Sequence, residues 1–137
     1  MPKLVLLADD NADNILLIKR ILKRSGLDIE IIDVQSGREV LKLAIERMPE
    51  VILLDMKMPD MDGYEAASML KSSDATKHIP VIAVTAQAMI GDKEKAFQAG
   101  CNEYLTKPVD SALLIDTLKK YLSRPERFRD GILWSEE

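Results

Sequence analysis

The apolar residues of this chain follow two alternating periods. Short, mainly apolar runs occur at residues 4–8, 29–34, 51–54 and 81–84, and a fifth short strand is expected at 103–106, around Tyr104 and Leu105. After each run, apolar residues recur at helical spacing, at 15–22, 40–48, 64–70, 96–99 and 114–122. Runs of the first kind are typical of strands, and spaced stripes are typical of helices. The pattern therefore predicts five strand–helix units.

The regular alternation of strands and helices predicts an α/β fold with one parallel sheet and helices on both faces. The first, third and fourth runs are apolar throughout, as expected for strands that are buried on both sides. Signals for helix ends agree with this interpretation. Ser36 and Glu39 fit a capping box, Asp62 is placed to cap the third helix, and Gly26 and Gly100 are placed to end the first and fourth.

The composition indicates one globular domain with a short extension. The chain has 137 residues, of which 47% are hydrophobic, and its formal net charge of -4 argues against nucleic acid as a partner. No apolar run approaches the roughly 18 residues of a membrane helix, and none resembles a signal peptide, so we expect a cytoplasmic protein with no membrane partner. We expect a domain at 1–122 and a tail or linker at 123–137, which could also dock on a partner or on the domain.

Polar side chains follow four of the five predicted strands at their carboxyl ends. Asp9 and Asp10 follow the first strand, Asp55 the third, Thr85 the fourth and Lys107 the fifth. Because the carboxyl ends of parallel strands meet at one edge of a sheet, we expect these side chains to lie close together. Taken singly, Asp10 or Thr85 could cap the next helix, and Lys107 could be a surface lysine. Their joint placement favours a shared site.

Three carboxylates in one crevice indicate a bound cation. Two carboxylates about 4 Å apart repel by roughly 4 kcal/mol at an effective dielectric constant near 20, and one lysine cannot offset all such pairs. Mg²⁺ binds through one or two carboxylates, and a magnesium ion beside a lysine and a hydroxyl suits a phosphoryl group. A carboxylate can also be the nucleophile. Asp55, which ends a core strand, is the best candidate.

Four short motifs, in this order, resemble the receiver domain of bacterial two-component response regulators. They are Ala-Asp-Asp at 8–10, Leu-Leu-Asp-Met-Lys-Met-Pro at 53–59, Val-Thr-Ala at 84–86 and Tyr-Leu-Thr-Lys-Pro at 104–108. The resemblance covers about residues 3–122. It implies a flavodoxin-like, doubly wound (βα)5 parallel sheet with strand order 2-1-3-4-5 in three α/β/α layers.

The resemblance implies that the strand ends form a phosphoacceptor site. Asp55 would accept a phosphoryl group from a phosphohistidine on a histidine kinase or a histidine phosphotransfer protein. Asp9, Asp10, Asp55 and the backbone carbonyl of Lys57 would bind Mg²⁺. Lys107 would bind a phosphoryl oxygen. The chain would be either a stand-alone regulator similar to chemotaxis regulators or a receiver from a larger protein such as a hybrid kinase.

The resemblance also implies a conformational switch. Thr85 would move to hydrogen-bond the phosphoryl group, Tyr104 would turn inward behind it, and the bond from Lys107 to Pro108 would be cis. The face made by the fourth helix, fifth strand and fifth helix would then change its affinity for a downstream protein partner. The residues at 89–90 would either pack at the start of the fourth helix or belong to this output face.

Two other functions stay open. An aspartyl-phosphate phosphatase or phosphotransferase could use a related sheet, but such enzymes usually carry a second acid two residues after the nucleophile, where this chain has Lys57. A degenerate receiver could bind partners without phosphate, but the complete set of strand-end residues disfavours it. We therefore predict a signalling switch that is not an enzyme and promotes only its own phosphorylation and dephosphorylation.

Overall fold

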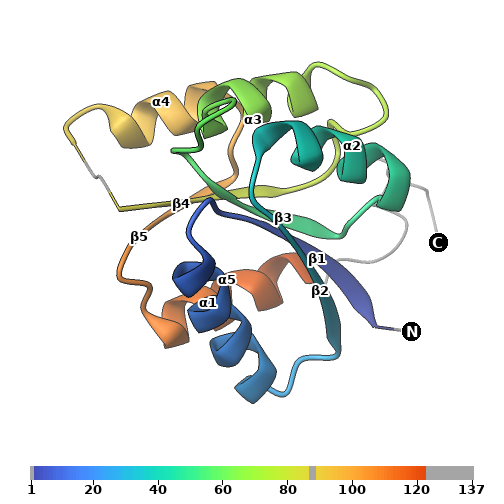
Figure 1. Cartoon of the computed structure of the whole chain (residues 1–137), viewed down its shortest axis with the longest axis vertical. Coiled ribbons are helices and arrows are strands. Elements are labelled where there is room, and N and C mark those ends of the chain that lie inside the picture. Colours follow the sequence, from blue (N-terminus) through green and yellow to red (C-terminus); the bar gives the residue numbers. More distant parts are fainter. Residues whose placement is uncertain (1, 87–88, 123–137) are drawn as a thin grey trace, which may run out of the picture.

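The computed structural model describes residues 2–86 and 89–122, which form a parallel sheet between two layers of helices (Figure 1). The five strands run in the spatial order β2-β1-β3-β4-β5. Each neighbouring pair is parallel. The strands are β1 (Lys3–Ala8), β2 (Ile29–Val34), β3 (Val51–Asp55), β4 (Val81–Thr85) and β5 (Glu103–Thr106). The predicted flavodoxin-like fold and its strand order are confirmed.

The helices divide into two groups by the face of the sheet that they cover. They are α1 (Ala12–Arg24), α2 (Gly37–Arg47), α3 (Gly63–Lys71), α4 (Asp92–Gln98) and α5 (Ser111–Leu122). In Figure 1, α2, α3 and α4 lie on one side of the sheet, and α1 and α5 lie on the other. Two hydrophobic clusters result, one on each face. Every residue of β3 and β4 is buried, which explains why both strands are apolar up to their last residues, Asp55 and Thr85.

The structure confirms the predicted capping residues of α2 and α3, and it shows that Asp10 and Thr85 do not cap helices. Ser36 and Asp62 cap α2 and α3 through their side chains. Asp10 does not cap α1, because the carboxamide oxygen of Asn11 accepts the first N–H groups of that helix. Thr85 does not cap α4 either, since Thr85 ends β4 and Gly91, with a φ of 92°, is the residue that precedes α4.

Two further expectations concern membrane-spanning helices and the predicted C-terminal tail. None of the helices in the described part of the chain is long and apolar enough to cross a membrane. The predicted tail at 123–137 lies outside the described residues. Leu122, which ends α5, is therefore the last residue whose position the structure gives.

Candidate functional site

The register of the sheet brings the polar strand ends together. Ala8 of β1 pairs with Leu54 of β3, so the next residues, Asp9 and Asp55, lie side by side. On the other side of β3, Asp55 pairs with Val84 of β4. Thr85 pairs in turn with the last residue of β5, directly before Lys107. A shift of one residue would turn each of these side chains to the opposite face, so the buried apolar pattern that sets the register also sets the site.

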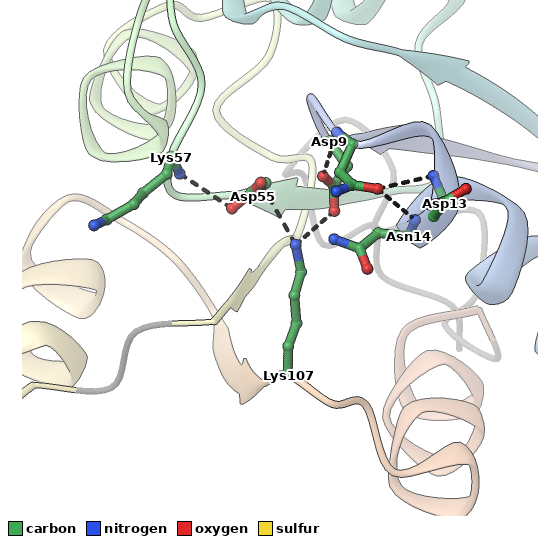
Figure 2. A network of polar contacts seen from close by, with 7 residues as sticks. Asp9, Asp13, Asn14, Asp55, Lys57 and Lys107 are labelled. Atoms are coloured by element: carbon green, nitrogen blue, oxygen red, sulfur yellow. Dashed lines mark hydrogen bonds and ion pairs between the residues drawn. The ribbon is translucent and has the colours of Figure 1, made fainter.

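Lys107 is the centre of a compact charge cluster at this edge (Figure 2). Its ammonium nitrogen lies 2.7 Å from Oδ2 of Asp9 and 3.5 Å from Oδ2 of Asp55. Figure 2 shows the lysine side chain rising from beyond β5 toward both carboxylates. It is not a solvated surface lysine, since only 12% of its side chain is exposed.

Backbone N–H groups hold the two buried carboxylates in place. The N–H of Asn11 donates to Oδ1 of Asp9 at 2.9 Å, and the N–H of Lys57 donates to Oδ1 of Asp55 at 3.1 Å. Asp9 is 2% exposed and Asp55 is 5% exposed. In each acid one oxygen is thus fixed by the backbone, and the other faces the lysine.

Burial raises the pKa of the Asp55 carboxyl from its ordinary 3.8 to about 6. The hydrogen bond from the Lys57 N–H opposes the rise, the negative charge of Asp9 adds to it, and the positive charge of Lys107 lowers the pKa again. Asp55 is therefore mainly ionised at neutral pH, although its surroundings penalise the charge.

The three acids have the donor atoms and the charge that suit a hard divalent cation. One carboxylate oxygen from each of Asp9, Asp10 and Asp55 lies within 4.8 Å of the other two. Two of these acids are buried and Asp10 is exposed, so the cluster opens to solvent on one side. Lys107 offsets only one of the three negative charges. The residues at this edge therefore fit Mg²⁺, which prefers carboxylate oxygens and keeps several waters.

Thr85 ends β4 at the edge that carries the cluster, and Tyr104 lies two residues before the end of β5. Thr85 is 2% exposed and lines a cavity of about 240 Å³ together with residues of α3, α4 and the segment after β3. Tyr104 is partly buried and packs against the core cluster on the face that α2, α3 and α4 cover. The bond between Lys107 and Pro108 is cis.

Lys57 contributes its backbone, rather than its ammonium group, to the cluster. Figure 2 shows its N–H directed at Asp55 while its side chain points away from that carboxylate. Lys57 is also among the residues that line the 240 Å³ cavity, together with Thr85. The residues Met89 and Ile90, which precede α4, are both exposed. This contradicts the alternative in which they pack at the start of the helix.

Gly63 has a role at the site that goes beyond the start of a helix. A Cβ atom added to Gly63 would lie 2.6 Å from the carbonyl oxygen of Asp55 and 2.6 Å from Cα of Met56. The N–H of Gly63 donates to the carbonyl oxygen of Met56 at 2.9 Å. The start of α3 therefore rests directly on the backbone that carries Asp55, and only glycine leaves room for this contact.

Asp60 also shapes the site without belonging to the charge cluster. Its two carboxylate oxygens accept the N–H groups of Gly37 at 2.9 Å and of Arg38 at 3.1 Å, at the start of α2. The hydrogen bond from Gly37 holds the pKa of Asp60 below its ordinary value. This bond fastens the loop between β3 and α3 to a helix that precedes it in the chain by about 20 residues, so no local sequence signal pointed to it.

The sequence matches a known protein family over most of its length. The family model described as the response regulator receiver domain matches residues 5–119. A polar-differentiation response regulator DivK from Brucella anthropi is 43% identical over 122 residues, which are 89% of this chain and 98% of the relative. The corresponding protein from Brucella ovis has the same identity and coverage.

Solved structures agree with the sequence relatives. A putative response regulator from Chloroflexus aurantiacus has a TM-score of 0.84 at 30% identity, covering 90% of this chain and 100% of that chain. The receiver domain of the sensor histidine kinase PA1611 from Pseudomonas aeruginosa has a TM-score of 0.81 at 31% identity, with the same coverage. That domain is described with a magnesium ion coordinated in its active-site cleft.

Proposed function

This chain belongs to the response regulator receiver domain family, and from this premise we propose that Asp55 is its phosphoacceptor. The protein is a phosphorylation-controlled signalling switch of a two-component system. The observation that carries the assignment of Asp55 is the position of Lys107, within 3.5 Å of Asp55 and 2.7 Å of Asp9. An ammonium shared by two buried carboxylates is placed to receive a phosphoryl oxygen when Asp55 is modified.

The proposed step transfers a phosphoryl group from a phosphohistidine to Asp55. A carboxylate oxygen of Asp55 forms a bond to phosphorus while the bond from phosphorus to the histidine nitrogen breaks, and the nitrogen keeps the electron pair. The product is an acyl phosphate on the protein. A pKa of about 6 leaves most Asp55 carboxyls ionised at neutral pH, as a nucleophile must be.

The neighbouring residues hold the phosphoryl group and report its presence. Lys107 binds one phosphoryl oxygen, exchanging part of its contact with Asp9 for this new anion. The hydroxyl of Thr85 donates to another oxygen. Tyr104 turns inward as Thr85 moves, and this changes the face made by α4, β5 and α5, to which the exposed Met89 and Ile90 contribute.

Asp9, Asp10, Asp55 and the backbone carbonyl of Lys57 would hold Mg²⁺. When bound, the ion would neutralise charge on the phosphoryl oxygens. The fit of the acidic cluster supports this assignment, as does the magnesium ion described in the Pseudomonas aeruginosa receiver domain. We expect Asp9 to act through a water molecule, because Lys107 already contacts its outer oxygen.

The wider setting follows from the same premise. The phosphodonor is a histidine kinase or a histidine phosphotransfer protein, the output partner is another protein, and the location is the cytoplasm. The receiver domain comprises residues 1–122, since the family match ends at 119 and α5 ends at Leu122. Lys57 stands where phosphatases of this chemistry carry a second acid, which supports turnover of the protein's own phosphoryl group only.

Phosphorylation by a small-molecule donor tests the assignment of Asp55. The protein is incubated with acetyl phosphate, with and without Mg²⁺, and its intact mass is recorded. We expect the mass of one phosphoryl group to appear only with Mg²⁺ and to be absent from Asp55→Ala. Asp74→Ala is the matched control, because Asp74 lies in an exposed loop and pairs only with Lys77 among the contacts recorded for the described residues.

Two results would contradict the assignment. One is phosphorylation of Asp55→Ala at the rate of the Asp74→Ala control. The other is a folded, Mg²⁺-binding protein that takes no phosphoryl group from acetyl phosphate or from any phosphorylated phosphotransfer protein, which would leave a switch that works without phosphate.

A further inference from the structure

A second concave surface lies at the opposite, amino-terminal end of the sheet. It is a groove of about 600 Å³ between the start of β1, the turn that leads into β2, and the end of α5. In Figure 1 these segments lie together, away from the carboxyl ends of the strands. The ammonium of Lys3 donates to the carbonyl oxygen of Leu122, which joins β1 to the last turn of α5. The groove is lined by Lys3, Leu27, Asp28, Ile29, Lys119, Lys120 and Leu122.

The groove combines an apolar floor with a basic rim. Leu27 and Ile29 are partly buried and pack against the core cluster that α1 and α5 cover. Lys119 and Lys120 are exposed at the edge, and Lys120 also pairs with Glu103 at 2.8 Å. Three lysines face a single acid, Asp28. Such a surface suits a short apolar peptide with acidic residues on either side.

The chain itself carries a segment of this kind, and the residues that lead to it begin at the groove. Residues 132–134 are Ile-Leu-Trp, and the stretch 130–137 around them contains Asp130, Glu136 and Glu137 but no basic residue. The arginines of the region all lie earlier, at 124–129. Leu122, after which the residues leading to this segment start, is itself part of the groove wall. The nine residues at 123–131 can span up to about 30 Å when extended, enough for 132–134 to return to the groove.

We propose that residues 130–137 dock in this groove of the same chain, with the apolar triplet 132–134 on Leu27 and Ile29 and the flanking acids beside the lysines. A tether of this length holds the segment at an effective concentration in the millimolar range, which favours binding within one chain over binding to a second copy. The inference is independent of the chemistry at Asp55. It assigns a binding surface and its occupant at the end of the molecule that phosphorylation does not use.

Trp134 is the only tryptophan in the protein and therefore reports on the segment directly. We expect its fluorescence in the full chain to be shifted to shorter wavelength, and its quenching by acrylamide to be several-fold weaker, relative to a peptide of residues 123–137. Leu27→Asp places a negative charge on the groove floor and should bring both readings to the peptide values. Lys119→Glu reverses one charge on the exposed rim and should move them part of the way.

Lys42→Glu is the matched control, because Lys42 is exposed on α2, on the other face of the sheet, and its reversal should change neither reading. If Leu27→Asp does not fold by circular dichroism, Lys119→Glu alone decides. The proposal is overturned if Trp134 in the full chain already behaves as in the peptide. It is also overturned if Lys119→Glu and Lys42→Glu have the same effect on the two readings. A wavelength shift that disappears on dilution would overturn it as well, because the segment would then dock on a second copy.

Discussion

The two ends of the sheet differ in where they place charged and apolar side chains. At the carboxyl ends of the strands, two buried carboxylates share one lysine beside an exposed third, and burial raises the pKa of Asp55 to about 6. At the amino ends, Lys119 and Lys120 are exposed at the rim, Lys3 is partly buried, and the groove floor is apolar. The first arrangement costs folding free energy, since charges are held where they repel. The second arrangement keeps the charges of Lys119, Lys120 and Asp28 exposed to solvent.

This difference indicates which end of the sheet suits phosphorylation and which suits the docking of a protein segment. A cluster that destabilises the unmodified protein is stabilised by whatever ligand neutralises it, so the carboxyl end responds to a metal ion and to phosphorylation. An apolar groove with solvated charges at its rim holds no repelling charges that a metal ion or a phosphoryl group would neutralise. The function that suits it is binding another segment of protein. The same strands thus support a reactive edge and a docking edge, and substitutions at the two edges should differ in size and in their dependence on pH.

The largest effect is expected from removing the shared lysine. Lys107→Ala leaves two buried acids without their ammonium, so the free energy of unfolding in the absence of Mg²⁺ should fall by about 3 kcal/mol near pH 8. The loss should shrink near pH 5, because Asp55 then takes up a proton. Urea denaturation at both pH values measures this, with Lys42→Ala, at an exposed position of α2, as the control. An equal loss at both pH values would contradict the electrostatic explanation.

A smaller effect is expected from crowding the backbone behind the nucleophile. Gly63→Ala places a methyl group 2.6 Å from the backbone of Asp55 and Met56. Such overpacking should lower the free energy of unfolding by about 2 kcal/mol and slow labelling by acetyl phosphate, because Asp55 is displaced.

The matched glycine for this test is Gly26, which has a φ of 80° and open space around it. Gly26→Ala should cost about 1 kcal/mol through backbone strain alone. It should leave the labelling rate unchanged. Equal labelling rates in the two variants would mean that the contact under Asp55 does not position it.

Replacing the nucleophile should stabilise the metal-free protein. The pKa of Asp55 in the folded state, about 6, lies above its ordinary value of 3.8, so the folded state holds the proton more tightly. The stability of the protein therefore falls as pH rises from about 4 to 6, and Asp55→Asn lacks this loss. We expect the variant to gain about 1–2 kcal/mol at pH 7 in EDTA, and nothing at pH 4. A variant less stable than the parent at pH 7 would contradict this, and Asp74→Asn serves as the control.

The smallest direct effect is expected at the other end of the sheet. Lys119→Glu changes an exposed rim residue, so the free energy of unfolding should change by less than about 1 kcal/mol, and labelling of Asp55 should not change. Urea denaturation beside Lys42→Glu measures this. A loss of several kcal/mol would mean that the amino end also holds coupled charges, and the contrast between the two edges would be lost.

The sequence was sufficient for the features that depend on local pattern. Apolar runs predicted the first four strands, the alternation of strands and helices placed the fifth, and the strand order followed from the family resemblance. Asp9, Asp55 and Lys107 could be placed at one edge because Asp55 ends its strand and the other two directly follow theirs. The contacts that bring distant segments together were not predictable. Nothing around Asp60 indicated its bonds to the start of α2, and no pattern revealed that Gly63 lies against the backbone of Asp55.

The same limit applies to the capping residues and the groove. Asp10 and Asn11 are both good capping residues, and only the geometry of the turn after β1 selects Asn11. Lys3, Leu27 and Lys119 are far apart in the chain and have no shared motif. They form one surface only because parallel strands start at one edge while α5 ends there.

The most direct test of the reactive edge is to identify the modified residue chemically. The protein is treated with acetyl phosphate, with and without Mg²⁺, and then with borohydride, which reduces an aspartyl phosphate to homoserine, and the peptides are sequenced by mass spectrometry. We predict homoserine at position 55 alone, and only when Mg²⁺ was present. Homoserine at position 9 or 10, or equal conversion of Asp55 without the metal, would contradict the assignment of the nucleophile and of its magnesium site.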